Sequence, residues 1–228
     1  IITLDKGFKN IVVGLGGSAT NDAGVGMAAA LGVKFLDVHG QILPPGGQSL
    51  SSLVSIDMSK AHPGLSVANI IGATDVTNTL CGDKGASAVF GPQKGANSSM
   101  IRELDEALAT FAAVVERDLS KTVIDIPGSG AAGGLGAGLI AFANAELRSG
   151  IDMVCDVLEF DQHLVGASLI LTGEGRADES TIYDKAPVGV ARRASKFGVP
   201  TIIMAGSIGE GYQKLYAHGI SGIVCIGD

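Results

Sequence analysis

Glycines and polar side chains gather directly after a short apolar strand that is expected over residues 10–13. The segment that follows reads GLGGSATND at residues 14–22, and an alanine-rich helix is expected from residue 20 to residue 31. Its glycines include Gly16 and Gly17, and its polar members are Ser18, Thr20, Asn21 and Asp22. Glycines permit a tight turn and a close ligand, and unpaired N–H groups at a helix start favour anions. The segment therefore predicts a site for a phosphorylated ligand, against the alternative of a capped helix start that packs closely on its glycines.

The same segment also matches a loose dinucleotide-binding pattern. Residues 14–19 fit G-x-G-x-x-G/A, and Asp37 ends the next expected strand 23 residues after Gly14. A carboxylate at that spacing can hold a ribose hydroxyl, so a NAD-dependent oxidoreductase of a small hydroxy acid stays open. The polar run at residues 18–22 argues against it, because such a loop needs close helix packing there. The sequence contains no Walker phosphate loop.

Three further glycine-containing segments follow expected strands, at residues 75–95, 128–138 and 173–185. In open α/β sheets, ligands bind at the carboxyl ends of the strands. The segment at 128–138 contains Gly133 and Gly134 and leads into a helix expected over residues 137–147. It is either a second backbone cradle for phosphate or carboxylate oxygens, or a flexible loop before a closely packed helix.

Asp75 and Asn78 come after a buried strand that is expected over residues 67–71. A carboxylate at this edge contacts a ligand or Mg²⁺, or else caps a helix. Farther along the chain, FGPQKG at residues 90–95 supplies the cation of Lys94 in a rigid turn.

Another strand is expected at residues 169–171. Two carboxylates, Glu174 and Asp178, and the guanidinium of Arg176 follow it. Paired acids can hold a metal or deprotonate a hydroxyl, and a guanidinium can bind a carboxylate or phosphate bidentately. Lys185 opens the next expected helix and is expected at the same site. The alternative is a solvated Glu–Arg pair.

Composition narrows the class of protein. Hydrophobic residues make up 46% of the 228 residues and charged residues 17%, which is typical of a globular protein with a sizeable core. The net charge of −7 argues against nucleic acid as the main partner. Three cysteines without a CxxC pair indicate reduced thiols and a cytoplasmic location, and the scattered histidines give no zinc spacing. No apolar run reaches the roughly 18 residues that span a membrane.

Alternating apolar runs and helical patterns predict an α/β protein with mostly parallel sheets and flanking helices. The other expected elements are strands at 33–36, 201–205 and 223–226 and helices at 98–118, 188–197 and 212–218. A boundary between residues 150 and 166 divides an α/β domain with glycine-rich loops (1–160) from part of a Rossmann-like domain (161–228). The first residue is not Met and the last expected strand has nothing to cover it. We therefore expect an internal fragment whose second domain is completed by missing terminal segments.

Taken together, the motifs resemble the type 1 glycerate kinase family, the bacterial glycerate 2-kinases. The matching stretches are GLGGSATNDAGVGM (14–27), FGPQKGA (90–96), PGSGAAGGLGAG (127–138) and LTGEGRADESTIYDKAPVGVA (171–191). They come in the family's order over nearly the whole chain. The chain departs from the family pattern at Ala23, Thr79, Ser180 and Asp184, where glycine, proline, glutamine and glycine are usual.

The resemblance implies two α/β domains in the full-length protein and transfer of the ATP γ-phosphoryl group to the 2-hydroxyl of D-glycerate, with Mg²⁺. The phosphate cradle is then Gly16, Gly17, Ser18 and Thr20, with Gly133 and Gly134, and Asn21, Asp22, Asn78 and Glu174 line the site. Asp75 and Asp178 ligate Mg²⁺ or deprotonate the hydroxyl. Arg176 binds the glycerate carboxylate, and Lys185 or Lys94 neutralises phosphate charge.

The expected partners are glycerate and ATP, with no nucleic acid and no membrane; the oligomeric state is open and includes a homo-oligomer. Two other functions stay open beside the kinase. One is the NAD-dependent oxidoreductase, and the other is an inactive α/β fragment.

Overall fold

The computed structural model describes residues 1–182 and 185–227, and the chain divides into two compact units. Unit 1 comprises residues 1–148 and unit 2 residues 149–228. Tyr183 and Asp184, which belong to the fourth family motif, lie outside the described residues. The sequence places its boundary between residues 150 and 166, whereas the structure divides the chain after Arg148.

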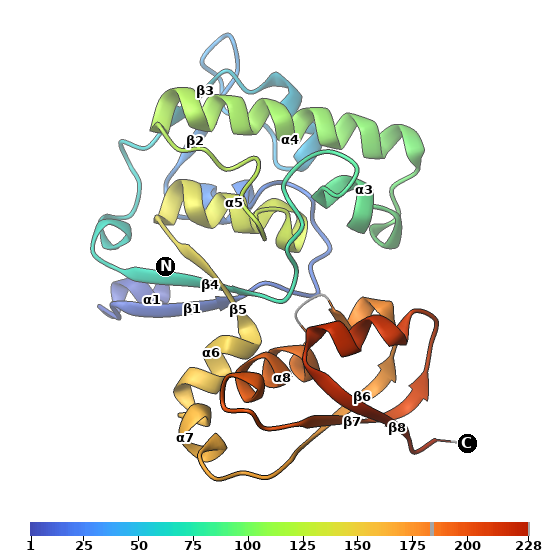
Figure 1. The fold of residues 1–228 in the computed structure, drawn as a ribbon. Helices are drawn as coiled ribbons and strands as arrows, with labels where there is room; N and C mark the ends of the chain where they lie inside the picture. The colour runs from blue at the N-terminus through green and yellow to red at the C-terminus, as the bar shows by residue number, and fades with distance from the viewer. Residues whose placement is uncertain (183–184, 228) are drawn as a thin grey trace. The chain divides into compact units, whose positions relative to one another are not determined.

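Unit 1 is built on a three-stranded sheet with the order β1-β4-β5 (Figure 1). Its elements are α1 (Ile2–Asp5), β1 (Asn10–Gly14), α2 (Val25–Ala30), β2 (Lys34–Leu36), η1 (Gly47–Ser52), β3 (Ser55–Asp57), η2 (Pro63–Ser66), β4 (Asn69–Thr74), α3 (Ala86–Phe90), η3 (Pro92–Lys94), α4 (Ser98–Leu119), α5 (Ala131–Ala143) and β5 (Glu146–Ser149). Strands β1 and β4 are parallel, with Val12 paired to Ile71. Their carboxyl ends therefore reach the same edge of the sheet, where the first glycine-rich segment begins.

Helix α5 packs on the sheet, and α4 lies on the far side of α5 (Figure 1). Ile70 and Leu139 are buried between α5 and the sheet. On the other side of α5, Phe142 meets Phe35 and Phe111 edge to face, with ring centroids 5.5 and 6.0 Å apart. The sheet edge that carries the glycine-rich loop thus rests on a buried apolar core.

The expected strand at residues 33–36 is present as β2, but it lies outside the main sheet. It pairs antiparallel with β3 in a separate two-stranded sheet, in which Phe35 stands opposite Ile56. Strand β3 spans only three residues and carries too little alternation to be recognised in the sequence, so neither β3 nor its pairing with β2 was predicted.

Unit 2 contains a parallel sheet with the order β6-β7-β8. Its elements are α6 (Gly150–Val157), α7 (Phe160–Leu164), β6 (Ile170–Ala177), η4 (Glu179–Ile182), α8 (Ala186–Lys196), β7 (Thr201–Ile208), η5 (Tyr212–His218) and β8 (Ile220–Cys225). Val188 and Ala191 of α8 pack on Ile203 and Ala205 of β7. These parallel strands confirm the expected α/β class.

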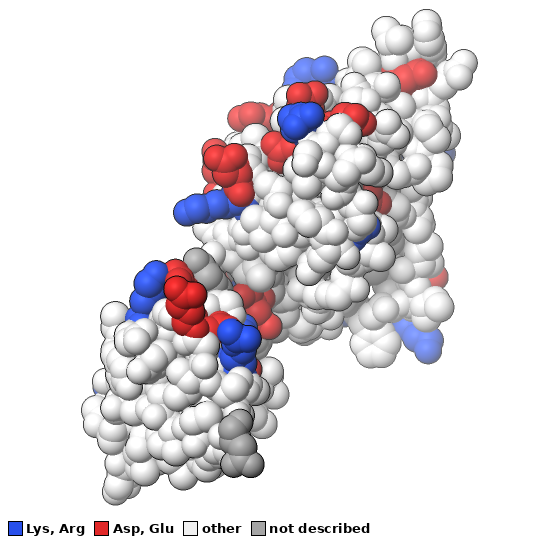
Figure 2. Space-filling view, turned by 90° about the vertical axis from the view of Figure 1, so that its right-hand side faces the viewer, with Lys and Arg blue, Asp and Glu red and all other residues white. Residues whose placement is uncertain are grey.

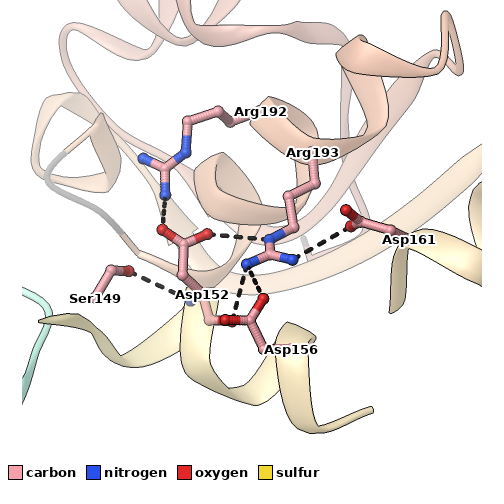
Figure 3. Close-up of polar contacts among 6 residues, drawn as sticks. All are labelled: Ser149, Asp152, Asp156, Asp161, Arg192 and Arg193. Carbon is pink, nitrogen blue, oxygen red and sulfur yellow. Dashed lines mark hydrogen bonds and ion pairs between the residues drawn. The ribbon is translucent and has the colours of Figure 1, made fainter. Parts of the chain in front are cut away.

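An ion-pair cluster ties α6 and α7 to α8 (Figure 3). The guanidinium of Arg193, on α8, lies 2.6 Å from Asp156 Oδ1, 3.1 Å from Asp152 Oδ1 and 3.3 Å from Asp161 Oδ1. Burial opposes the charged form, but the hydrogen bonds to the three carboxylates raise the pKa of Arg193 overall. The cluster fixes the helices that pack beside the sheet of unit 2.

Two expected helices have other bounds. The helix expected over residues 20–31 begins only at Val25, because Ala23 and Gly24 both take left-handed backbone angles, with φ of 54° and 71°. The helix expected over 137–147 is α5, which ends at Ala143 with Asn144 in the left-handed region, and Leu147 belongs to β5. The segment expected as a helix at 212–218 is the 3₁₀ helix η5.

Candidate active site

The glycine-rich loop after β1 opens onto a cavity of about 200 Å³. It is lined by Leu15, Gly16, Gly17, Ser18, Val76, Phe90, Gln93, Lys94 and Ala132. A Cβ built at Gly16 or Gly17 would meet no described atom within 4 Å, so the backbone of both residues is open to a ligand. Gly17 also has a φ of 60°, which glycine adopts without strain. A tight turn with an accessible backbone is what the sequence predicts here.

Lys94, the last residue of η3, is hydrogen-bonded to this loop. Its Nζ donates to Ser18 Oγ at 2.8 Å and to the carbonyl oxygen of Thr20 at 2.6 Å. An ammonium group has three N–H donors, so one remains for a ligand. Because Ser18 Oγ accepts from Lys94, its own O–H is left to donate into the cavity.

The cavity is therefore rich in donors. As far as the structure describes the chain, its lining contains one cation and no Asp or Glu. Burial lowers the pKa of Lys94, and the charge of Asp22 partly opposes that shift. Figure 2 shows charged residues of both signs interspersed on one face of the molecule, with broad areas that carry none. The attraction for an anion at the cavity comes from Lys94, the cation in its lining.

Asp22 and Asn21 make hydrogen bonds that stabilise the ends of the loop. The carboxylate of Asp22 accepts from the backbone N–H of Gly24 at 3.1 Å and of Gly26 at 3.2 Å, so it caps the start of α2. Asn21 Nδ2 donates to the buried Ser87 Oγ at 2.9 Å. Neither residue is among those that line the cavity.

Gly133 and Gly134 bring the 128–138 segment against the first loop. A Cβ at Gly133 would lie 2.0 Å from the carbonyl oxygen of Thr20, and one at Gly134 would lie 2.9 Å from Ala23 Cα. The carbonyl oxygen of Gly133 accepts from Ala23 N–H at 3.0 Å. Close packing of two loops explains both glycines, while the neighbouring Ala132 is the residue that reaches the cavity.

Asp75 and Asn78 follow β4 but behave differently. Asp75 is exposed, and no hydrogen bond or ion pair to another described residue engages its carboxylate. Asn78 Nδ2 donates to the carbonyl oxygen of Lys84 at 2.8 Å, and Asn78 O accepts from Gly130 N–H at 3.0 Å. Asn78 therefore holds the loop together, whereas Asp75 is available to a ligand.

In unit 2, Arg176 and Asp178 form a pair at the end of β6. Arg176 Nε lies 3.1 Å from Asp178 Oδ2. Asp178 Oδ1 accepts from Ser180 N–H at 2.9 Å and from Ser180 Oγ at 2.6 Å. The hydroxyl hydrogen bond of Ser180 is the largest cause of the lowered pKa of Asp178, so this carboxylate is held in its ionised form.

Lys185 reaches the same group through Ser180, because Lys185 Nζ donates to Ser180 Oγ at 3.0 Å. Glu174 Oε1 accepts from the N–H of its neighbour Gly175 at 3.0 Å. The structure thus brings Arg176, Asp178 and Lys185 together. Ser180 was noted only as a departure from the family pattern, and no local signal in the sequence shows that its hydroxyl joins them.

The dinucleotide alternative needs a carboxylate beside the first loop. Asp37 Oδ1 instead accepts from the N–H groups of His39 and Gln41, both at 2.8 Å. Asp37 directly follows β2, which belongs to a different sheet from β1. The dinucleotide-binding pattern at residues 14–19 therefore lacks the βαβ arrangement that would place Asp37 beside a ribose.

Comparison with known proteins decides the family, because the profile of the glycerate kinase family matches residues 2–228. The chain belongs to the glycerate kinase family. The glycerate kinase of Halalkalibacterium halodurans is 50% identical over 220 residues, which cover 96% of this chain and 58% of that protein. The glycerate 2-kinase of Escherichia coli K12 is 47% identical over 223 residues, which cover 98% and 58%.

The fold agrees with that assignment. A crystal structure from Salmonella typhimurium LT2, described as glycerate kinase 2, superposes with a TM-score of 0.80 and is 48% identical. The match covers 98% of this chain and 58% of that one. The chain therefore spans a little over half the length of these glycerate kinase relatives. None of the described helices combines the length and apolar character that a membrane crossing requires.

Proposed function

We propose that the protein containing this chain transfers the γ-phosphoryl group of ATP to the 2-hydroxyl of D-glycerate and forms 2-phosphoglycerate. The observation that carries the proposal is the cavity of unit 1, where Lys94, Ser18 and an open glycine backbone place donors in a partly apolar lining. Such donors neutralise phosphoryl oxygens, and phosphoryl transfer depends chiefly on positioning and charge neutralisation. Membership in the glycerate kinase family supports the choice of reaction.

The size of the cavity limits what it holds. At about 200 Å³ it is smaller than the roughly 300–1,000 Å³ of pockets that enclose a drug-sized molecule. It suits one phosphoryl group or a small acid rather than a whole nucleotide. In this role Lys94 compensates the negative charge, and Ser18 and the backbone of Gly17 orient the oxygens.

Asp75 fits the role of Mg²⁺ ligand better than Asp178 does. Among the described residues, no group of three or more His, Cys, Asp or Glu side chains could hold a metal ion. Mg²⁺ in kinases needs only one or two carboxylates besides water and phosphate oxygens. Asp75 offers an exposed carboxylate, whereas Oδ1 of Asp178 accepts hydrogen bonds from Ser180 and Oδ2 is in an ion pair with Arg176. When bound, Mg²⁺ would neutralise charge on the phosphate chain.

Arg176 and Asp178 are assigned to the acid substrate. The side chain of Arg176 is 65% exposed, and only its Nε faces Asp178, so its terminal N–H groups can bind the glycerate carboxylate. Asp178, held ionised, would accept a hydrogen bond from the attacking hydroxyl and take up its proton late in the transfer. Lys185 compensates negative charge at this carboxylate through Ser180.

A thermal-shift experiment on the protein tests this function against its competitors. We expect ATP with Mg²⁺ to raise the melting temperature and NAD to leave it unchanged, because a ligand stabilises only the state that binds it. Stabilisation by NAD alone would favour the oxidoreductase. No shift with either nucleotide would overturn the nucleotide-binding part of the proposal.

A further inference from the structure

We infer that Gly209 is a positioning residue for Arg176, and that its missing side chain makes room for the Arg176–Asp178 pair. Gly209 directly follows β7, and its N–H donates to the carbonyl oxygen of Ala177 at 2.8 Å. This bond fixes the end of β7 beside the end of β6. The hydrogen atom that Gly209 carries in place of a side chain faces the pair.

The space at Gly209 is too small for a methyl group. A Cβ built there would lie 2.7 Å from Arg176 Nε, 2.9 Å from a terminal nitrogen of Arg176, and 2.7 Å from Asp178 Cβ. Carbon atoms in van der Waals contact are about 3.5–4.0 Å apart, so something must move. The φ of Gly209 lies outside the left-handed region, so alanine would fit its backbone angles. Glycine is therefore needed at this position because a side chain has no room, and not because of its backbone angles.

Arg176 is the group that would move. Asp178 is anchored at several points, because its carboxylate accepts from Ser180 and its N–H donates to Thr181 Oγ1 at 3.2 Å. Thr181 is itself fully buried. Arg176 is mostly exposed, and its guanidinium meets Asp178 through Nε. A methyl group at Gly209 would thus turn the flexible guanidinium away, and it would also press on Asp178 Cβ, which can give way only by a small shift because the carboxylate and the N–H of Asp178 are held.

The kinetic consequence rests on the proposed role of Arg176 in binding the glycerate carboxylate. Gly209→Ala is expected to raise the KM for glycerate about tenfold, which corresponds to one weakened charge-assisted hydrogen bond. The KM for ATP is expected to stay near that of the parent, and kcat is expected to change by a smaller factor than the KM for glycerate. Gly173→Ala is the matched control, because the same methyl on β6 meets nothing within 4 Å.

The test compares Gly209→Ala, Gly173→Ala, Arg176→Ala and the Arg176→Ala/Gly209→Ala double variant in the whole protein. If Gly209 acts through Arg176, Gly209→Ala adds nothing in the Arg176→Ala background. An unchanged KM for glycerate, an equal rise in both KM values, or a full effect in the double variant would overturn the inference.

An NMR measurement separates this inference from the proposed function. The Nε–H resonance of Arg176, assigned by its loss in Arg176→Lys, reports the bond to Asp178 without any turnover. We expect this resonance to shift toward that of a solvent-exposed arginine in Gly209→Ala and to stay in place in Gly173→Ala. An unshifted resonance in Gly209→Ala contradicts the inference even if the enzyme is active. A shifted resonance in a protein that does not phosphorylate glycerate supports the positioning and contradicts only the function.

Discussion

The ion-pair cluster of unit 2 allows a quantitative prediction for Arg193→Met. The side chain of Arg193 is 12% exposed and donates to Asp152, Asp156 and Asp161, including the carbonyl oxygen of Asp152 at 2.9 Å (Figure 3). Methionine keeps much of the length and apolar stem of arginine but removes every one of these donors. Asp152 would keep its ion pair with Arg192, at 2.6 Å, but the three carboxylates would lose the cation that they share.

The expected cost follows from burial. Removing one partner of a buried ion pair costs about 3–5 kcal/mol, because a charge is left uncompensated. Here the carboxylates of Asp152, Asp156 and Asp161 are 30%, 45% and 47% exposed, so water can reach them once the guanidinium is gone. We therefore expect the lower end, about 3 kcal/mol of unfolding free energy.

Urea unfolding, combined with hydrogen exchange of α6, α7 and α8, measures this cost in the protein. Lys196→Met is the matched control, since it removes the same charge from the same helix at an exposed position. We expect it to change the unfolding free energy by less than about 0.5 kcal/mol. If Arg193→Met also stays within about 1 kcal/mol of the parent, the cluster does not hold these helices together.

Three further predictions concern the site and the pH dependence. Lys94→Met should weaken ATP binding about 10- to 100-fold, measured by calorimetry, because a charge-assisted hydrogen bond is lost; unchanged affinity would remove Lys94 from the phosphate site. Asp75→Asn should raise the Mg²⁺ concentration needed for half-maximal turnover, and an unaltered Mg²⁺ dependence would contradict its assignment. Backbone hydrogen bonds lower the pKa of Asp37, and the hydrogen bond from Arg117 lowers that of Asp118, both from 3.8. These two carboxylates therefore bind protons more readily in the unfolded chain than in the folded one. The urea concentration at the midpoint of unfolding should fall when the pH is lowered below about 4, and a constant midpoint down to pH 3 would refute this.

The strands β1, β4, β6, β7 and β8 and their order along the chain were predictable, because buried parallel strands are short continuous apolar runs that end at glycine or polar residues. The strands β3 and β5 were not predicted. That is why the loop after β1, the polar residues after β4 and the charged residues near the end of β6 were chosen as candidates. The start of α2 was not predictable. Ala23 takes a left-handed conformation that alanine rarely adopts, and only the packing of Gly133 and Gly134 against it explains this. For α5, Asn144 was a local signal for the helix end, since asparagine tolerates that conformation.

The cavity depends on contacts that no local pattern contains. Lys94 and Ser18 are 76 residues apart in sequence and meet only because η3, which ends at Lys94, lies against the loop after β1. The apolar lining from Leu15, Val76 and Phe90 was not predicted for the same reason. Gly209 lies beyond a strand whose end was placed too early, at residue 205 instead of Ile208. Residue types at strand ends thus indicate the chemistry, whereas tertiary packing selects which of them share a site.

Phosphorus NMR of the reaction product tests the central claim most directly. The whole protein is incubated with ATP, Mg²⁺ and D-glycerate, and the phosphorylated acid is identified by its phosphorus shift and by its coupling to the carbon-bound protons. The account predicts one ADP for each 2-phosphoglycerate formed. Formation of 3-phosphoglycerate would contradict the assigned hydroxyl, and the absence of any glycerate-dependent ADP would contradict the kinase itself.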